Sequence, residues 1–320
     1  MKNVLVTGGT GFLGSNICKY LTQAGYKVTV FDNNFRGKIR RLESIKKNIV
    51  FVNGDIQKKE DLKKAIKNID TVIHLAYING TRFFYEMPIN VLNVGIKGIF
   101  NILEICKDYR IKNFFLASSS EVYQTPNKIP TGEDEMLKVP DVYNPRYSYG
   151  GGKIISEMLS LYYGKKFFKK LIIFRPHNVY SEDMGEEHVI PQLINKTLKN
   201  KHKNFIKIKG KGKEIRSFIH INDFMQAFDL IFRKGKHLEI YNIGTTEKIS
   251  IKELAMKVIK KINKKIKIKT GEVFKGNTNI RCPDISKIKK LGFKQNVILE
   301  KGLDLIINNL KIELSLKKLS

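Results

Sequence analysis

Hydrophobic positions follow two alternating patterns along the first half of the chain. Short runs rich in Val, Ile, Leu and Phe alternate with longer stretches in which apolar residues recur every three or four positions. Runs of the first kind are typical of buried strands, and stretches of the second kind are typical of helices with one apolar face. The predicted strands are 3–7, 27–31, 49–52, 71–75, 114–117 and 171–174, and the predicted helices include 12–21, 58–67, 88–109 and 149–166. Strands that alternate with helices predict an α/β fold with a doubly wound parallel sheet.

The second half of the chain lacks this regular alternation. Helical patterns at 189–200, 222–233, 250–263 and 299–311 are mixed irregularly with short strand-like runs at 205–208, 217–219 and 266–270. We therefore expect residues 1–178 to form the main sheet domain and residues 179–314 to form, for the most part, a smaller C-terminal α/β substrate lobe. Residues 315–320 are expected to be a frayed basic tail.

The first strand runs into a glycine-rich turn that opens the first helix. The turn is GGTGFLG at 8–14, and the second strand ends at Asp32, 18 residues after Gly14. Glycines let a pyrophosphate approach the backbone closely, and the helix start offers unpaired N–H groups to its phosphates. An acid at the end of the second strand binds the adenosine ribose and repels a 2′-phosphate, which favours NAD over NADP. This arrangement predicts a Rossmann dinucleotide site.

Two further strand ends belong to the same predicted site. Asp55 and Ile56 follow the third strand and can flank an adenine ring, although a simple turn is the alternative. Leu75 and the small Ala76 follow the fourth strand, where backbone can pass close to a cofactor. The predicted cofactor-binding residues are Gly8, Gly11, Phe12, Leu13, Gly14, Asp32, Asp55, Ile56, Leu75, Ala76, Tyr149 and Lys153.

A serine-rich strand end and a tyrosine–lysine pair predict an alcohol-oxidation site. Ser119 follows the strand 114–117, at the edge of a parallel sheet where ligands bind. Tyr149 and Lys153 are four residues apart and share one helix face. A nearby ammonium and a cationic nicotinamide favour the phenolate, so Tyr149 can take a proton from a hydroxyl while hydride leaves for NAD⁺. Ser119 would hold that hydroxyl.

Composition restricts the class of protein but identifies no further catalytic residues. The 320 residues are 42% hydrophobic, as in ordinary globular proteins, and no apolar run approaches the ~18 residues that suggest a membrane span. The chain starts directly in the first strand, so we expect no signal peptide and a cytoplasmic protein. The three cysteines and six histidines show no metal-binding spacing, which predicts reduced thiols and no metal.

The net charge of +29 raises the question of an anionic partner. Only ten of the 59 basic residues are Arg, and the lysines are spread over nearly every predicted helix. Proteins that read nucleic-acid sequence depend on Arg for bidentate contacts. We therefore expect a solvated basic surface and neither a nucleic-acid nor a membrane partner.

The motifs together resemble extended short-chain dehydrogenase/reductases of the NAD-dependent nucleotide-sugar epimerase/dehydratase family. The resemblance covers nearly the whole chain and rests on GGTGFLG (8–14), GDI (54–56), HLAY (74–77), SSSEVY (118–123), YGGGK (149–153), RPHNVY (175–180) and EIRSFIHINDF (214–224). The segment RCPDISKIKKLGF (281–293) is similar to the tail of UDP-glucuronate decarboxylases.

This resemblance implies an enzyme with tightly bound NAD that oxidises C4 of a nucleotide-diphosphate sugar, in a pathway to surface glycans. Asn178 and Arg216 would contact the diphosphate region of the substrate, and Arg281 is a weaker candidate for the same task. The resemblance also implies a homodimer, in which each subunit contributes the helices 88–109 and 149–166.

The reaction that follows C4 oxidation stays open at this stage. A 4-epimerase is favoured because it needs only Ser119, Tyr149 and Lys153. A 4,6-dehydratase is close behind, because Glu121 lies two residues after Ser119 and is expected on the same side of an extended chain, where it could act as a C5 base. A decarboxylase would need a site for a carboxylate, for which Arg146 or Arg82 are candidates. A non-catalytic NAD-binding or nucleic-acid-binding protein is the remote alternative.

Overall fold

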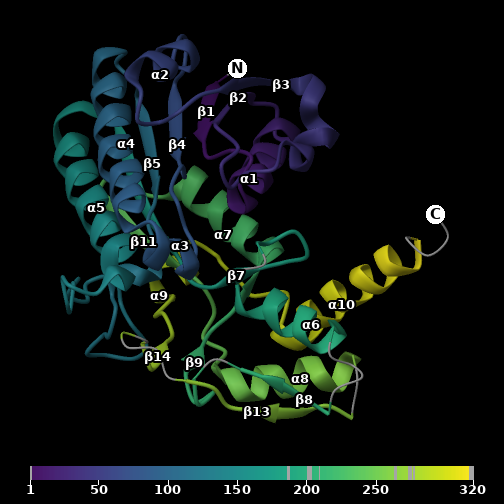
Figure 1. The fold of residues 1–320 in the computed structure, drawn as a ribbon. Helices are drawn as coiled ribbons and strands as arrows, with labels where there is room; N and C mark the ends of the chain where they lie inside the picture. The colour runs from purple at the N-terminus through teal and green to yellow at the C-terminus, as the bar shows by residue number, and fades with distance from the viewer. Residues whose placement is uncertain are drawn as a thin grey trace. The chain divides into compact units, whose positions relative to one another are not determined.

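The structure is a computed structural model that describes residues 2–185, 188–199, 204–208, 210–262, 265–272, 276 and 278–316. The chain forms two compact units (Figure 1). The sheet unit consists of Met1–Gln124, Met136–Pro176 and Ala227–Asn242. The second unit consists of Thr125–Glu135, His177–Gln226 and Ile243–Ser320. Each unit has its own hydrophobic core.

The sheet unit is built on a seven-stranded sheet with the order β11-β6-β5-β4-β1-β2-β3. Its strands are β1 (Asn3–Thr7), β2 (Lys27–Asp32), β3 (Ile49–Asn53), β4 (Thr71–His74), β5 (Asn113–Ala117), β6 (Lys170–Pro176) and β11 (Glu239–Ile243). The strand β1 pairs in parallel with both β2 and β4, so the strand order reverses at β1. Strands covered on both faces read as continuous apolar runs, and Val4, Leu5 and Val6 are fully buried. The predicted doubly wound α/β sheet is confirmed.

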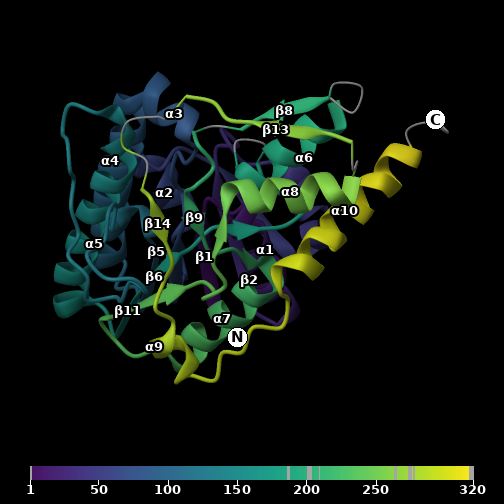
Figure 2. The same cartoon turned by 90° about the horizontal axis from the view of Figure 1, so that it is seen from below.

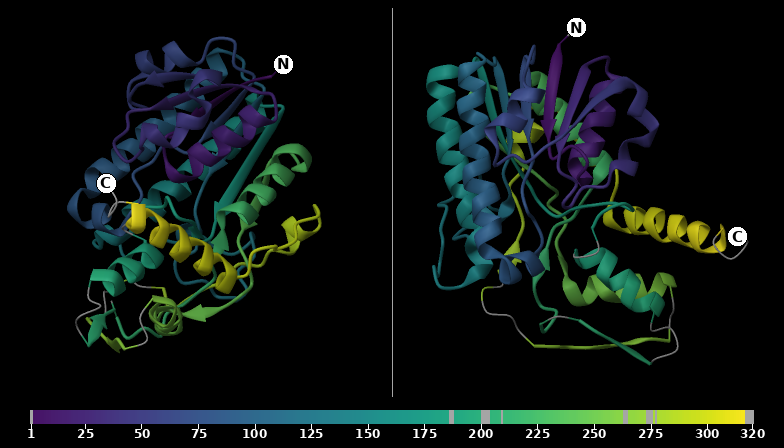
Figure 3. Two further views of the ribbon diagram at one scale, coloured as in Figure 1. Left: turned by 90° about the vertical axis from the view of Figure 1, so that its right-hand side faces the viewer. Right: turned by 45° about the horizontal axis from the view of Figure 1, so that its top comes forward.

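Helices cover both faces of this sheet. They are α1 (Phe12–Gln23), η1 (Ile39–Asn48), α2 (Lys59–Ala65), α3 (Thr81–Glu86), α4 (Pro88–Asp108), η2 (Ser120–Val122), η3 (Pro145–Tyr147), α5 (Ser148–Phe167) and the second half of α7 (Ile221–Lys234). The helices α4 and α5 run side by side along one face (Figure 3). On the side of α1, Phe228 of α7 packs edge-on against Tyr20 and Phe174.

Among the described residues, α4 is the one helix that is long and apolar enough to cross a membrane, a feature that the sequence analysis missed. Half of its apolar window is buried inside the protein. Its buried residues Ile99, Ile102 and Leu103 belong to the core between the helices and the sheet. The apolar character of α4 therefore has an explanation in the packing of the sheet unit.

The described residues of the second unit form short strands and four complete helices. The strands are β7 (Val179–Tyr180) beside β10 (Ile219–His220), β9 (Ile215–Arg216) between β12 (Ile249–Ser250) and β14 (Ile280–Arg281), and β8 (Phe205–Lys207) beside β13 (Lys267–Lys269). The helices are α6 (Val189–Lys199), α8 (Ile251–Ile262), α9 (Ser286–Lys289) and α10 (Leu299–Leu316). The helix α8 packs against α6 and α10 (Figure 2). Leu193, Leu254 and Leu303 are buried where these helices meet.

The structure differs from the sequence-based boundaries at several places. The expected border at residue 178 does not separate the units, because 239–243 returns to the first sheet as β11 and 125–135 lies in the second unit. The predicted strand 217–219 is wrong, because β9 ends at Arg216 and β10 begins at Ile219. Between these two short strands, the Ser217 carbonyl accepts a hydrogen bond from the Asn178 amide at 2.8 Å. Residues 315 and 316 of the expected tail belong to α10, and 317–320 lie outside the described residues.

Candidate active site

The glycine turn after β1 forms a cradle for a ligand that approaches the backbone. Gly8 has φ +71°, and a Cβ atom there would lie 2.7 Å from the backbone nitrogen of Ala76. A Cβ atom on Gly14 would lie 2.1 Å from the carbonyl oxygen of Gly8. Gly11 caps α1 without a side-chain hydrogen bond, so the first N–H groups of the helix are left for an external acceptor. These features fit the pyrophosphate of a dinucleotide.

Asp32 lies at the end of β2 and is 9% exposed. Its carboxylate accepts hydrogen bonds from the Thr10 N–H at 3.0 Å and from the Asn34 N–H at 2.8 Å. Because a carboxylate has about four acceptor positions, the group can still accept bonds from ribose hydroxyls. Asp32 therefore shapes the turn and fits its predicted role at the same time.

The loop after β4 lies beside the glycine turn. The Leu75 N–H donates to the Thr7 carbonyl at 3.0 Å, and the Ala76 N–H donates to the Thr7 hydroxyl at 3.4 Å. At the start of α1, Phe12 and Leu13 are half-buried. The structure thus brings these predicted cofactor residues to the carboxyl edge of β1 and β4.

The loop after β3 lies at the same edge. The Gly54 N–H donates to the Asp32 carbonyl at 3.2 Å, so the following residues, Asp55 and Ile56, lie next to the end of β2. Ile56 is buried, and the Asp55 carboxylate accepts a hydrogen bond from the Gln57 N–H at 2.9 Å. Both residues therefore have a structural task in addition to the predicted contact with adenine.

Ser119, Tyr149 and Lys153 come together in the sheet unit. The Ser119 hydroxyl hydrogen-bonds the phenol of Tyr149. Tyr149 is buried, with the ring of Phe84 stacked on it at 5.0 Å between centroids. The Lys153 ammonium donates to the carbonyl of Ala117, the last residue of β5, at 2.7 Å. The three predicted catalytic side chains therefore meet where β5 ends and α5 begins.

Burial shifts both titratable groups of this cluster. It raises the pKa of Tyr149 above that of an ordinary phenol, while the hydrogen bond from Ser119 opposes the rise. It lowers the pKa of Lys153 to about 7, while the Glu157 carboxylate opposes the fall. The Lys153 ammonium is 5.8 Å from the centroid of the Tyr149 ring. Burial therefore disfavours the Tyr149 phenolate, and a further cation close to the phenol would favour it.

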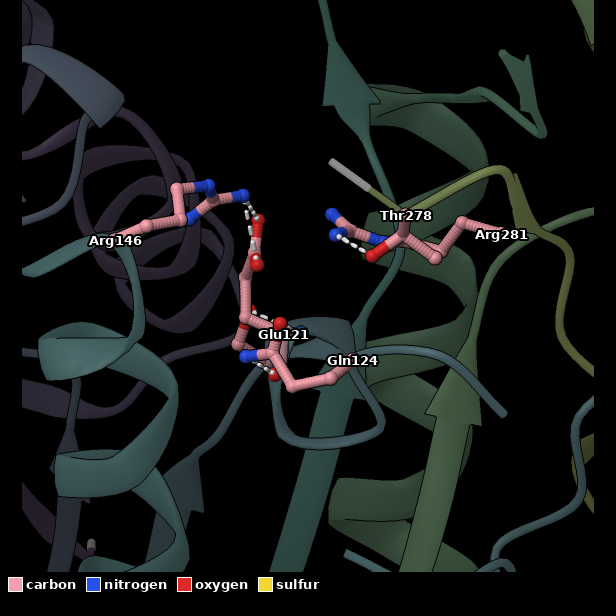
Figure 4. Close-up of polar contacts among 6 residues, drawn as sticks. Glu121, Gln124, Arg146, Thr278 and Arg281 are labelled. Atoms are coloured by element: carbon pink, nitrogen blue, oxygen red, sulfur yellow. Dashed lines mark hydrogen bonds and ion pairs between the residues drawn. The ribbon is translucent and has the colours of Figure 1, made fainter. Parts of the chain in front are cut away.

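Glu121 does not lie on an extended chain, so that expectation is wrong. The Ser119 hydroxyl accepts a hydrogen bond from the Glu121 N–H at 3.1 Å and caps the 3₁₀ turn η2. The two Glu121 carboxylate oxygens accept bonds from one Arg146 nitrogen, Nη2, at 2.9 and 3.0 Å (Figure 4). The side chains of Arg146 and Glu121 are only 8% and 15% exposed. Both residues are candidates from the sequence, but their pairing is visible only in the structure.

A buried polar network behind the cluster was also missed. Arg175 donates to Glu157 through Nε at 2.9 Å and through Nη2 at 2.6 Å. A third bond runs from Arg175 to the Tyr123 hydroxyl, which donates to Asn242 at 2.8 Å. This network joins α5, β6, β11 and Tyr123, the residue that follows η2. The available signal was the position of Glu157, four residues after Lys153 on the same helix.

The predicted substrate residues lie in the second unit. Asn178 has φ +42°, and its amide donates to the Ser217 carbonyl at 2.8 Å. Arg216 of β9 and Arg281 of β14 are register partners in a parallel pair, so both side chains leave the same face of this small sheet. Arg281 donates to the Thr278 hydroxyl at 3.1 Å (Figure 4). Two guanidinium groups on one face fit the oxygens of a diphosphate.

Comparisons with known proteins show the family to which the chain belongs. The family model described as "NAD dependent epimerase/dehydratase family" matches residues 4–244. A dTDP-D-glucose 4,6-dehydratase of Dictyostelium discoideum is 34% identical over 81% of this chain, and the match spans 62% of that protein's length. A putative UDP-glucose 4-epimerase of Methanocaldococcus jannaschii is 33% identical over 96% of this chain and 98% of its own. A UDP-N-acetyl-alpha-D-glucosaminuronate decarboxylase of Bacillus cytotoxicus is 31% identical over 94% and 95%.

A solved structure extends the likeness to the fold. The dTDP-glucose 4,6-dehydratase of Bacillus anthracis, determined in complex with NAD, superposes with a TM-score of 0.82 at 26% identity. The superposition covers 96% of both chains. The names of the three relatives describe three different reactions, a 4,6-dehydration, a 4-epimerisation and a decarboxylation.

Proposed function

The chain belongs to the NAD-dependent epimerase/dehydratase family, and we propose that it is a nucleotide-sugar 4-epimerase that oxidises C4 of the sugar with tightly bound NAD. The family and the relatives are NAD-dependent enzymes of nucleotide-sugar metabolism. One observation carries the choice of reaction. The Ser119–Tyr149–Lys153 cluster is assembled, while the carboxylate nearest to it in sequence, Glu121, is held by Arg146.

The cofactor site follows from the glycine turn and its neighbours. The N–H groups at the start of α1 would bind the pyrophosphate, and Asp32 would accept bonds from the adenosine ribose. The Ala76 backbone lies so close to Gly8 that a side chain at position 8 would not fit. Backbone rather than a side chain would therefore face the cofactor here. NAD, when bound, supplies the hydride acceptor.

The chemistry at the sugar rests on three side chains. The Ser119 hydroxyl would orient the C4 hydroxyl beside the Tyr149 oxygen, which takes its proton as hydride leaves the same carbon. The Lys153 ammonium and the cofactor's positive charge would together oppose the burial that raises the pKa of Tyr149. Tyr149 would then return the proton to the C4 oxygen while hydride is delivered to the other face of the rotated 4-keto sugar, which would complete an epimerisation.

The Glu121–Arg146 pair supports epimerisation over dehydration. A 4,6-dehydratase needs a base that removes the C5 proton, and a carboxylate paired with a guanidinium is a weak base because its ionised form is stabilised. Arg146 is engaged by Glu121, and Arg82 is exposed and paired with Glu86. The two arginines that a decarboxylase could use for a substrate carboxylate thus already have carboxylate partners.

The remaining assignments complete the proposal. Asn178, Arg216 and Arg281 would bind the diphosphate of the substrate from the second unit. The protein would act in the cytoplasm as a homodimer, in synthesis of surface-glycan precursors, without a nucleic-acid or membrane partner. Apolar side chains exposed on α4 and α5 support a dimer through these helices: Ile89, Phe100, Ile155, Met158 and Tyr162.

Incubation with UDP-, dTDP-, GDP- and CDP-sugars in D₂O, followed by NMR, tests the reaction. We expect conversion of one sugar into its C4 epimer with no deuterium bound to carbon. A 4-keto product with deuterium at C5 or C6 would establish a dehydratase, and release of CO₂ from a uronate would establish a decarboxylase.

A further inference from the structure

The ring of Tyr77 contacts both titratable members of the catalytic cluster. Tyr77 follows β4 in the loop that holds Ala76. The Lys153 ammonium lies 4.2 Å from the centroid of the Tyr77 ring, closer than to the ring of Tyr149. The rings of Tyr77 and Tyr149 pack edge to face, with 5.0 Å between their centroids and 82° between their planes. Tyr77 therefore touches the proposed base and its cation at once.

Two glycines leave room for the Tyr77 side chain at this position. A Cβ atom on Gly95 of α4 would lie 2.0 Å from the Tyr77 hydroxyl, and one on Gly152 of α5 would lie 2.1 Å from it. The hydroxyl is buried and has no hydrogen-bond partner among the described residues. A glycine on each helix thus opens a slot for this phenol. Gly152 belongs to the YGGGK motif, so the slot explains why one of its three glycines cannot carry a side chain.

We propose that Tyr77 is a positioning residue, whose ring face keeps Lys153 charged and in place beside Tyr149. The proposal rests on the proposed function, in which Tyr149 is the base. An aromatic face attracts an ammonium that has lost its water, and such contacts are worth about a two- to thirtyfold change in an equilibrium constant. The hydroxyl gains no such contact, so the ring carries the effect.

Other groups around Lys153 do not replace this contact. From its own helix Lys153 faces Tyr149 and Glu157, and Glu157 already accepts two bonds from Arg175. From β4 it faces His74, whose pKa is lowered to about 3 by burial and by Lys153 itself, so this imidazole is neutral. From β5 it contacts the carbonyl of Ala117. Burial still lowers the pKa of Lys153 to about 7. Loss of the ring contact would therefore leave a larger fraction of the Lys153 side chains deprotonated at neutral pH.

A series of variants at position 77 separates the ring from the hydroxyl. Tyr77→Phe keeps the ring and should keep kcat within about twofold. Trifluorophenylalanine at this position keeps the shape but weakens the negative face of the ring. With this residue and with Tyr77→Leu, kcat should fall about tenfold at neutral pH with KM unchanged, and the acid limb of the kcat profile should move to higher pH.

A second readout does not depend on turnover. In the cofactor-free protein with ¹³C-labelled lysine, the Lys153 signal should titrate near pH 7, far below ordinary lysines at about pH 10. A Lys153→Arg variant assigns the signal. The midpoint should fall by about one pH unit with trifluorophenylalanine or Leu at 77 and stay unchanged in Tyr77→Phe. Phe84→Leu is the matched control, because Phe84 also packs on Tyr149 and should leave the Lys153 midpoint unchanged.

The outcomes are decisive for Tyr77. An unchanged Lys153 midpoint with the fluorinated ring, or a Phe variant as impaired as the Leu variant, would overturn the proposal. Because the fluorinated ring keeps its shape, misfolding of Tyr77→Leu would not obscure the result. If the wild-type protein epimerised no nucleotide sugar, the proposed function would fail while the lysine titration still tested Tyr77.

Discussion

Strands of the sheet unit are four to seven residues long, whereas five strands in the described part of the second unit contain two residues each. In the sheet unit, polar groups follow long buried strands: Asp32 is the last residue of β2, and Ser119 comes two residues after the end of β5. In the second unit, Arg216 and Arg281 lie inside two-residue strands and depend on one register. The proposed catalytic side chains are thus supported by long paired strands, while the proposed substrate contacts depend on short strand pairings.

Loss of the Tyr149 hydroxyl should have the largest effect in this comparison. Tyr149→Phe keeps the buried ring and its stacking on Phe84 but removes the proton acceptor. We expect kcat to fall about 10³-fold, with unchanged NAD content and thermal stability. Turnover of the identified nucleotide sugar measures the loss. A variant with full turnover would show that Tyr149 of the sheet unit is not the base.

Loss of an arginine from the second unit should affect binding alone. Arg216→Ala removes one of the two guanidinium groups on the small sheet and should raise KM about 30-fold while kcat stays within about twofold. Arg233→Ala is the matched control, because Arg233 is exposed on α7 and paired with Asp229. Steady-state kinetics at saturating and limiting substrate check the split, and a fall in kcat without a change in KM would contradict it.

The buried Lys153 should make the stability of the sheet unit depend on pH. Its folded pKa of about 7 lies below the unfolded value of about 10.4, so the unfolded state binds more protons between these values. The free energy of unfolding should therefore rise from pH 7 towards pH 9, by about 1 kcal/mol per pH unit relative to Lys153→Met. Below about pH 7 the two proteins should show parallel pH dependence. Urea unfolding of both proteins across this range is the measurement.

Removal of the Glu121 charge should have the smallest effect. Glu121→Gln keeps a partner for Arg146, so we expect epimerase kcat to change less than about threefold. In a 4,6-dehydratase the same change would remove the C5 base and abolish product formation. Parallel assays for the epimer and for a 4-keto product distinguish these cases, and a loss of all turnover would show that Glu121 reacts directly.

Much of the sheet unit could be predicted because its signals are local. The strands, the glycine turn, Asp32 and the shared helix face of Tyr149 and Lys153 depend on residues close in sequence, and the structure agrees with each. The strand predicted at 217–219 failed because two-residue strands leave too short a pattern to read. The return of 239–243 to the first sheet, next to β6, depends on a partner strand more than 60 residues away.

By itself, the sequence determined the order of strands and helices in the sheet unit, the glycine turn and the candidate catalytic side chains. These features follow from periodicity, from glycine geometry and from spacing within a single element. Only the tertiary structure decided that Arg146 holds Glu121, that Arg175 joins Glu157 to Tyr123, and that Gly95 and Gly152 admit the Tyr77 ring beneath Lys153. Each of these contacts joins separate elements, and burial makes them energetically decisive because an unpaired charge in the interior is costly.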